Sequence, residues 1–287
     1  MSARVDKVLI IGLGLIGGSL ARALKKRGWA DQLVAYGHRD VSLKKGVELG
    51  VIDSYTLDLE EALSGADVVV IGAPTLKAAE ILEDVLQRVD ESTVVTDVAS
   101  VKNNLLRAAA GAPNFVPGHP IAGSEQSGVE ASRAELFVDH RVILTPSELT
   151  NPDATALVQD MWLCTGAEVV RMGVREHDAI LAATSHLPHV LAYALVDALS
   201  RSELSEDIFR FAAGGFRDFT RIASSDPVMW RDISIANRDE LLLAIDSFSS
   251  HLADLRTAVA ASDAAALHET FAAAKAARDA FAIKKNQ

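Results

Sequence analysis

The sequence has 287 residues, of which 49% are hydrophobic, and its formal net charge at pH 7 is −11. A chain of this length and composition can form two soluble globular domains with substantial cores. The negative charge argues against a nucleic-acid or anionic-membrane partner, because either would require a basic surface. Any anionic substrate must therefore be attracted by a local cluster of arginine and histidine side chains.

The single cysteine, Cys164, excludes an intramolecular disulfide and is typical of a reducing compartment. Its apolar neighbours, residues 161–163, favour a buried core thiol over a nucleophile. We find no signal sequence before the first predicted strand and no apolar run that approaches the length of a membrane span. We therefore expect a cytoplasmic protein.

A glycine-rich turn between a predicted strand and a predicted helix is the most informative stretch near the N-terminus. The apolar run Val8–Ile11 leads into Gly12, Gly14 and Gly17. Gly12 permits a tight turn, Gly14 lets the backbone approach a pyrophosphate, and Gly17 lets the helix pack close to the strand. The N–H groups and the dipole of the helix start attract negative charge. With the second apolar run Leu33–Tyr36, the pattern predicts a bound dinucleotide rather than a turn before an ordinary surface helix. The predicted contacts are Gly12, Gly14, Leu15, Ile16 and Gly17.

The end of the second predicted strand lacks the acidic residue that binds the ribose hydroxyls of NAD in this motif. Gly37, His38 and Arg39 stand there instead. No carboxylate repels a 2′-phosphate, and Arg39 can form charge-assisted hydrogen bonds with one, although it can equally be a solvated loop residue. We therefore expect His38 and Arg39 to contact the cofactor and NADP to be favoured, with NAD as the alternative.

Two further strands end in residues suited to face a cofactor. The continuous apolar run Val68–Ile71 is typical of a strand buried in a parallel sheet. Ala73 and Pro74 follow it, and they either line the nicotinamide nucleotide or form a plain strand-to-helix turn. Ser100 follows the next strand, and it either caps the following helix, points its hydroxyl into the site, or does both. The predicted helices of this part are 41–49, 59–63 and 77–88, and the second of these strands is 93–97.

Residues 117–128 contain two prolines and three glycines and are predicted to be an irregular loop. Titratable side chains in rigid loops are frequent in catalytic sites. A neutral imidazole is the natural acceptor for a hydroxyl proton when a hydride leaves the same carbon, since its unperturbed pKa is about 6.5. His119 is therefore the candidate base, and the alternative is a structural histidine bonded to loop backbone.

The pattern changes near Met172 and Gly173. Before them we predict strands at 142–144 and 168–171 and a helix at 153–164, whereas only helical periodicity rich in alanine and leucine follows. We expect a dinucleotide-binding domain at residues 1–172 and an all-helical substrate-binding and dimerisation domain at residues 173–287. The fold class is α/β, with a Rossmann-type doubly wound, mainly parallel sheet before the helical domain.

The first helix of the second domain contains Pro188, which should kink or restart it. His186 and His189 lie three residues apart and share one face. No glutamate or thiol completes a zinc-binding motif, so no metal is expected and a substrate contact is favoured for His189. His186 is interpreted as a histidine of the core.

An arginine pair follows the Gly214-Gly215 break. Arg217 and Arg221 are four residues apart on one predicted helical face, with Asp218 in reach of Arg221. Such a pair is often a solvated surface, but the interleaved phenylalanines indicate a partly enclosed turn. A guanidinium there suits a carboxylate. Trp230 either closes this pocket or belongs to the core.

Residues 241–281 are predicted to form two long helices split around Ser262-Asp263. Helices of this length carry more apolar surface than the second domain can bury internally. A symmetric homodimer is therefore expected, and no further regulatory domain is expected after the helices.

Together these motifs resemble the prephenate and arogenate dehydrogenase family of tyrosine biosynthesis, including its broad-specificity cyclohexadienyl members. The motifs are GLGLIGGS, DVASVK, GHPIAGSEQSG, TSHLPH and GGFRDFTRIASSDPVMW, and they span nearly the whole chain. The resemblance implies oxidative decarboxylation of prephenate, arogenate or both, with hydride transfer to NAD(P). The product is aromatic, either 4-hydroxyphenylpyruvate or tyrosine. The family also implies dimerisation through interlocked helices.

Carried over by motif, the resemblance assigns roles to particular side chains. His119 accepts a hydrogen bond from the ring hydroxyl, and Ser100 lies between that hydroxyl, His119 and the nicotinamide. Arg221 binds a substrate carboxylate. The other implied substrate contacts are His189 and Trp230, with Glu125 and Asp218 at the pocket mouth.

Two other functions remain as alternatives. A 3-hydroxyacid dehydrogenase or imine reductase of the same architecture would use a catalytic lysine early in the second domain, but residues 174–198 contain none. A dinucleotide-sensing protein without turnover would need neither the base His119 nor the carboxylate-binding Arg221.

Overall fold

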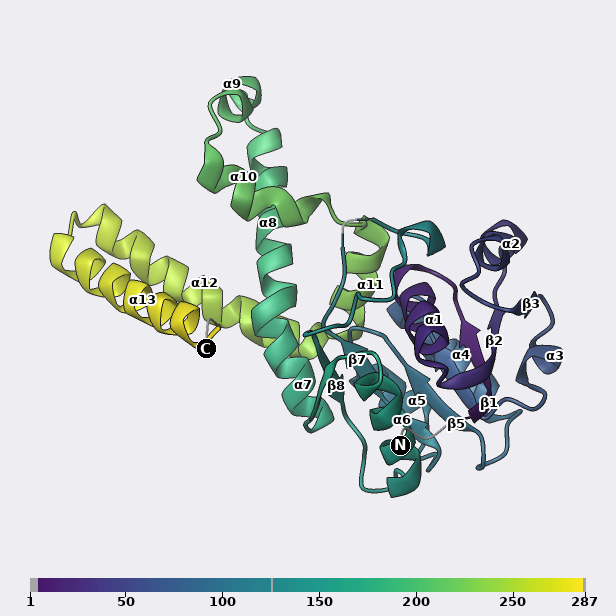
Figure 1. Ribbon diagram of the computed structural model, residues 1–287. Coiled ribbons are helices and arrows are strands. Elements are labelled where there is room, and N and C mark those ends of the chain that lie inside the picture. The colour runs from purple at the N-terminus through teal and green to yellow at the C-terminus, as the bar shows by residue number, and fades with distance from the viewer. Residues whose placement is uncertain (1–4, 125, 286–287) are drawn as a thin grey trace. The chain divides into compact units, whose positions relative to one another are not determined.

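The structure is a computed structural model and describes residues 5–124 and 126–285 (Figure 1). By its internal contacts the chain separates into residues 1–238 and 239–287. The first unit contains a sheet of six strands in the order β3-β2-β1-β4-β5-β6, in which every neighbouring pair is parallel. The strands are β1 (Val5–Ile11), β2 (Ala30–Tyr36), β3 (Ser54–Thr56), β4 (Val68–Ile71), β5 (Val94–Asp97) and β6 (Phe115–Val116).

The middle of this sheet is apolar on both faces, as its sequence predicts. All four residues of β4 are fully buried, and Ile11 of β1 pairs with Ile71 of β4. Branched side chains pack well on a sheet that is covered on both sides. Because the strands are parallel and in register, their carboxyl ends meet along one edge.

Helices cover both faces of the sheet. On one face Leu20 and Leu24 of α1 join a core with Trp162 of α6, and on the other face Leu82 of α4 packs with Leu105 of α5. The doubly wound α/β class is therefore confirmed. The helices are α1 (Leu15–Arg27), α2 (Asp40–Glu48), α3 (Leu59–Leu63), α4 (Thr75–Leu86), α5 (Asn103–Ala108) and α6 (Pro152–Leu163).

A second, three-stranded sheet contains β7 (Gly118–Pro120), β8 (Arg141–Leu144) and β9 (Glu168–Arg171). β7 is antiparallel to β8, with His119 opposite Ile143, and β8 is parallel to β9. The prediction of a wholly irregular loop is therefore wrong at residues 118–120. β7 lies at the edge of its sheet, where a proline is tolerated.

Only helices follow β9 in the part of the chain that the structure describes, as predicted. In the first unit these are α7 (Val174–Leu181), α8 (Leu187–Ser200), α9 (Ser205–Arg210), α10 (Gly214–Thr220) and α11 (Pro227–Ala236). The prediction of a domain boundary near Met172 and Gly173 stays a prediction.

The α-helix restarts beside Pro188, which is one of the two predicted outcomes. A π-helical turn, η2 (Ala182–His186), accommodates the proline, and α-helical bonding resumes at Leu187. The resulting run Val174–Ser200 is long and apolar enough to cross a membrane by length and composition alone. The expectation that no apolar run reaches that length is therefore wrong. The run is nevertheless weak evidence for a membrane, because its His177 and Asp178 are buried and hydrogen-bonded within the protein.

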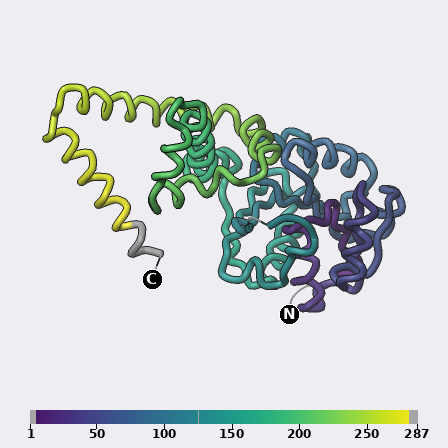
Figure 2. Tube along the Cα trace, turned by 90° about the horizontal axis from the view of Figure 1, so that it is seen from above, coloured from purple at the N-terminus to yellow at the C-terminus, as the bar shows by residue number. Residues whose placement is uncertain are grey.

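The second unit consists of α12 (Arg238–Ala260) and α13 (Ala264–Lys285), which confirms the predicted pair of long helices. Ser262 has a φ of +52° in the connecting turn, and the side chain of Asp263 accepts the backbone N–H of Ala266 at 3.0 Å. Figure 2 shows the two helices diverging from this turn.

Candidate active site

The turn between β1 and α1 leaves room for an anion at the helix start. Gly12 has a φ of +94°, and a Cβ atom on Gly17 would lie 2.5 Å from the carbonyl oxygen of Gly12. A Cβ atom on Gly14 would meet no atom within 4 Å, so the space in front of this residue is open. No side chain caps α1, and its first turn contains no acidic residue. The N–H groups of this turn therefore fit the pyrophosphate of a dinucleotide.

The other predicted cofactor contacts lie along the same edge of the sheet. This edge is the switch point between β1 and β4, where parallel α/β sheets bind their ligands. The structure brings together the ends of four strands there, with Gly12, Gly14, Leu15, Ile16 and Gly17 after β1, His38 and Arg39 after β2, Ala73 and Pro74 after β4, and Ser100 after β5.

Ser100 does not cap the helix that follows β5. α5 begins at Asn103, and the carboxylate of Asp178 in α7 accepts the backbone N–H groups of Lys102 and Asn103, each at 2.9 Å. A carboxylate from another helix thus performs the capping. One of the two interpretations of Ser100 is therefore wrong, and a hydroxyl in the site remains the prediction.

His119 projects from β7 and is only 9% exposed. Its Nδ1 atom lies 2.9 Å from Nε2 of His177, and Nδ1 of His177 lies 2.8 Å from Oδ1 of Asp178. The candidate base is therefore the first member of a buried His–His–Asp chain that joins β7 to α7.

The backbone next to His119 is held by a second buried pair. Lys102 and Asp97 are both fully buried and form an ion pair. Nζ of Lys102 also donates to the carbonyl oxygen of Gly118 at 2.6 Å, and Oδ1 of Asp97 accepts the N–H of Gly118 at 3.1 Å. β7 is thereby fixed against the carboxyl end of β5, the strand that precedes Ser100.

Burial determines the charge states in this chain. It lowers the pKa of His119 well below the usual range, and the neighbouring His177, Lys102 and His186 lower it further. Burial also lowers the pKa of His177. The pKa of Asp178 is lowered as well, because hydrogen bonds from His177 and from the two backbone N–H groups outweigh its burial. At neutral pH both imidazoles are therefore neutral and the carboxylate is charged.

The helical side chains predicted to touch substrate lie around Trp230. The rings of His189 and Trp230 are stacked, with their centroids 3.5 Å apart, and His186 meets Trp230 edge-on at 6.2 Å. His186 is buried and accepts a hydrogen bond from Asn237 at its Nδ1, which agrees with its interpretation as a core histidine. Trp230 also packs against Val101, the residue after Ser100. The predicted substrate contacts around Trp230 and the predicted site residue Ser100 therefore meet at the loop between β5 and α5.

The arginine pair stands at the C-terminal end of α10. α10 ends at Thr220, and Arg221 follows as its C-cap with helical backbone angles and begins the 3-10 turn η3 (Arg221–Ser224), so it lies one helical turn after Arg217. Of the three phenylalanines predicted to enclose this turn, Phe211 and Phe219 are exposed and Phe216 is half-buried. Arg221 lies near enough to His189 to contribute to the lowering of its pKa, which burial dominates.

Two predicted site residues remain, Asp218 and Glu125. Asp218 is exposed on α10. Glu125 lies outside the described residues.

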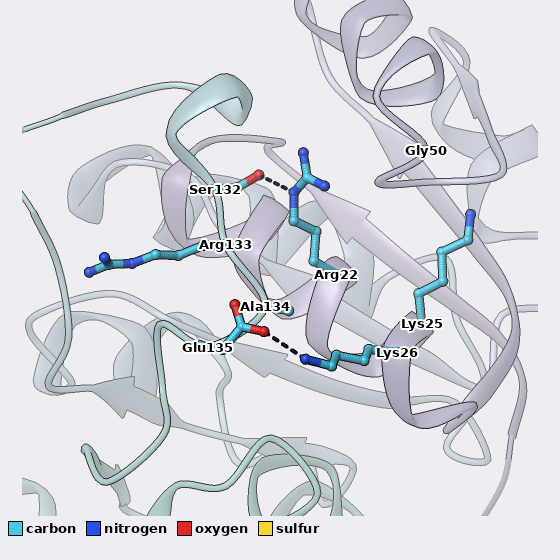
Figure 3. Close-up of a pocket in the computed structure, with 8 residues that line it drawn as sticks. All are labelled: Arg22, Lys25, Lys26, Gly50, Ser132, Arg133, Ala134 and Glu135. Atoms are coloured by element: carbon cyan, nitrogen blue, oxygen red, sulfur yellow. Dashed lines mark hydrogen bonds and ion pairs between the residues drawn. The ribbon is translucent and has the colours of Figure 1, made fainter.

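A hollow of about 560 Å³ lies elsewhere, between α1 and residues 132–135 (Figure 3). Arg22 donates to the hydroxyl of Ser132 at 2.9 Å, and Lys26 pairs with Glu135 at 2.7 Å. These contacts attach the segment that follows the 117–128 stretch to α1. None of the predicted site residues lines the hollow.

Sequence reasoning did not identify His177, Asp178 or Lys102 as part of the site. The available signal was a His-Asp pair directly before the apolar residues 179–183, together with the lysine of the DVASVK motif. Charged groups in such positions are expensive to bury unless they are paired. Their partners come from distant parts of the chain, so spacing alone does not reveal them.

Comparison with known proteins agrees with this geometry. Residues 20–171 match the family described as prephenate dehydrogenase, nucleotide-binding domain, and residues 174–273 match prephenate dehydrogenase, dimerization domain. A cyclohexadienyl dehydrogenase from Zymomonas mobilis is 38% identical over 94% of both chains. A prephenate dehydrogenase from Bacillus subtilis is 36% identical over 99% of this chain and 78% of its own. The crystal structure of prephenate dehydrogenase from Aquifex aeolicus in complex with hydroxyphenyl propionate and NAD+ covers 98% of this chain and 100% of its own, with a TM-score of 0.92 and 36% identity. This chain therefore belongs to the prephenate dehydrogenase family.

Proposed function

We propose that the protein catalyses the NAD(P)-dependent oxidative decarboxylation of prephenate, arogenate or both in tyrosine biosynthesis. The observation that carries this proposal is the buried, neutral His119, held beside the carboxyl edge of a dinucleotide-binding sheet. Oxidation of a ring hydroxyl requires a proton acceptor close to the hydride acceptor. Prephenate gives 4-hydroxyphenylpyruvate, and arogenate gives tyrosine. A cytoplasmic location accords with such a biosynthetic role.

In the proposed reaction the proton moves to His119 and then returns. A bound nicotinamide would supply the acceptor for the hydride that leaves the ring carbon carrying the hydroxyl. His119 takes the hydroxyl proton as the bond between ring and carboxylate breaks and CO2 leaves. The electron pair of that bond enters the ring, which becomes aromatic. His119 then returns the proton to the ring oxygen, so the imidazole ends neutral and no net proton is released.

The proposed cofactor is NADP, with NAD as the alternative. The glycine turn and the start of α1 fit the pyrophosphate. Asp40, the first carboxylate after β2, already accepts a hydrogen bond from the hydroxyl of Tyr55 and pairs with Lys44, each at 2.7 Å. It is therefore poorly placed to bind ribose hydroxyls, whereas Arg39 is exposed and suits a 2′-phosphate.

We propose that the substrate lies between His119 and the helical side chains. Nε1 of Trp230 is a buried donor without an acceptor among the described residues, and an oxygen of the substrate would supply one. His189 stacks on this ring, and Arg221 would bind a carboxylate. Ser100 would complete the contact with the ring hydroxyl, and Asp218 and Glu125 would lie at the entrance.

The proposed assembly is a homodimer formed by the helical domain. The matched dimerization domain spans residues 174–273. Large apolar side chains are exposed on its helices, which is unusual for a monomer and gives a second copy a surface to cover. They include Phe209, Phe211 and Phe219 in the first unit, and Leu243, Leu252, Val259 and Phe271 in the second.

A substrate panel tests the function. Purified protein should convert prephenate or arogenate with NAD or NADP and release one CO2 for each reduced cofactor, and the four combinations define the preferences. Turnover only on 3-hydroxy acids or imines would favour the rival dehydrogenase or reductase. Cofactor binding without turnover of any substrate would favour the sensor.

A further inference from the structure

We propose that His177 and Asp178 fix the tautomer of His119, so that its Nε2 atom always presents a lone pair to the substrate hydroxyl. The two residues act as positioning residues, because neither touches the proposed substrate. The inference rests on the proposed function for the identity of the proton that is transferred. The tautomer itself is a property of the protein alone.

The chain of hydrogen bonds starts at Asp178, which can only accept. Its Oδ1 receives the N–H of Lys102 at 2.9 Å and lies 2.8 Å from Nδ1 of His177, and its Oδ2 receives the N–H of Asn103 at 2.9 Å. A charged carboxylate has no hydrogen to donate. The hydrogen between Asp178 and His177 therefore sits on Nδ1 of His177.

A neutral imidazole carries one hydrogen, so Nε2 of His177 has a lone pair. This atom is 2.9 Å from Nδ1 of His119, which must then be the donor. His119 is neutral too, and its single hydrogen is used in that bond. Nε2 of His119 is left as an acceptor.

The opposite tautomer would disable the proposed step. With a hydrogen on Nε2, His119 would face the substrate hydroxyl as a second donor and could not take its proton. In the inferred tautomer the imidazolium that forms keeps its bond to His177, and the charge of Asp178 lies behind it. A buried acid that holds a catalytic imidazole in one tautomer has the same effect in serine proteases, where its loss costs about 10⁴-fold in kcat.

Asp178 is also fixed independently of the histidines. Its two backbone bonds cap α5, and the carbonyl oxygen of its own residue accepts a hydrogen bond from Asn237 at 2.9 Å. Removing the ring of His177 should therefore leave Asp178 in place. This separation makes His177 the better position for a test.

The direct test is ¹⁵N NMR of histidine-labelled wild-type protein at neutral pH, without substrate. The tautomer of each ring follows from its two nitrogen shifts, and His119→Asn and His177→Gln assign the signals. We expect both rings to be neutral with the hydrogen on Nδ1. A hydrogen on Nε2 of His119, or a rapid mixture of tautomers, would overturn the proposal. Because no turnover is involved, this result is independent of whether prephenate or arogenate is the substrate.

The kinetic test compares two substitutions at one position in the full-length enzyme. His177→Phe removes the acceptor and should lower kcat about 100-fold, with the substrate KM and the cofactor Kd within threefold of wild type. In His177→Gln, the carbonyl oxygen of the new side chain can replace the acceptor. The kcat of this variant should therefore be at least tenfold higher than that of His177→Phe. A His177→Phe enzyme with wild-type kcat, or a His177→Gln enzyme no better than a folded His177→Phe, would contradict the proposal. If His177→Phe does not fold, the NMR result alone decides.

Discussion

Within the proposed site, His119 is buried and held by hydrogen bonds, whereas Arg221 is exposed. His119 is buried, its ring bonds to His177, and the adjacent Gly118 is bonded through both its N–H and its carbonyl oxygen. Arg221 is exposed and begins a short 3-10 turn after α10. The proposed proton acceptor is therefore held by the core of a single chain. The proposed carboxylate-binding group lies on an exposed turn.

This contrast has a physical basis. A proton transfer requires the acceptor in one tautomer and one orientation before the substrate arrives, and a rigid core provides both. A guanidinium can adjust to a carboxylate as it binds, since charge and fork geometry tolerate movement of the side chain. Substitution of His119 should consequently affect kcat, and substitution of Arg221 should affect the substrate KM.

The largest effect is expected at His119. His119→Asn removes the proton acceptor and should lower kcat by about 10²- to 10⁴-fold while the substrate KM changes little. Steady-state kinetics with cofactor titration would measure both. His140→Asn, at an exposed histidine, is the matched control and should behave as wild type. Equal losses in kcat and in substrate affinity would refute the role of base.

Arg221→Ala should instead weaken substrate binding. Loss of a charged hydrogen bond to a carboxylate that is buried in the complex costs about 2–4 kcal/mol, which corresponds to a rise in KM of roughly 30- to 1000-fold. Arg217→Ala is the control, because this residue lies on α10 rather than in the η3 turn. A wild-type substrate KM in Arg221→Ala would show that Arg221 does not bind the substrate carboxylate.

Arg39→Ala tests the predicted contact with the 2′-phosphate of the cofactor. It should raise the KM for NADP about tenfold and leave the KM for NAD unchanged, because only the 2′-phosphate loses a partner. Arg133→Ala, beside the hollow in Figure 3, is a control of equal charge. Identical NADP affinity in wild type and in Arg39→Ala would show that Arg39 is a solvated loop residue.

The buried histidines should also make stability depend on pH. Burial lowers the pKa of His186 to about 4, and it lowers the pKa values of His119 and His177. The unfolded chain takes up these protons below a pH of about 6.5, whereas the folded protein does not, so the free energy of unfolding should fall as pH drops from 7 to 5. The slope is at most about 1.4 kcal/mol per pH unit for each histidine.

Urea unfolding at several pH values measures this slope. His186→Asn should reduce it, and His268→Asn, at an exposed histidine of α13, should not. An unfolding free energy that is constant between pH 7 and 5 would contradict this prediction, because it would show that the native protein takes up the same protons as the unfolded chain.

Much of the nucleotide-binding part could be predicted because its signals are local. Val68–Ile71 is apolar at every position, and Gly12, Gly14 and Gly17 stand between a strand and an amphipathic helix. Such patterns are determined by periodicity and by backbone geometry within a few residues. The strands and helices that they predicted are present, with ends shifted by a few residues.

The groups around His119 could not be predicted in the same way. Asp178 touches Lys102 and Asn103, which are separated from it by 76 and 75 residues along the chain. Pro188 predicted a kink or a restart of its helix, but not the π-helical form of the η2 turn that precedes it. Asp178, rather than Ser100, caps α5, because tertiary packing places its carboxylate at the backbone N–H groups of Lys102 and Asn103.

A crystal structure of the protein with NADP and a hydroxyphenyl carboxylate, such as 4-hydroxyphenylpyruvate, tests the central claim most directly. We predict that one molecule spans both regions, with its ring oxygen within about 3 Å of Nε2 of His119 and its carboxylate on Arg221. A ligand that contacts only one of these residues, with the other facing a separate cavity, would contradict the account.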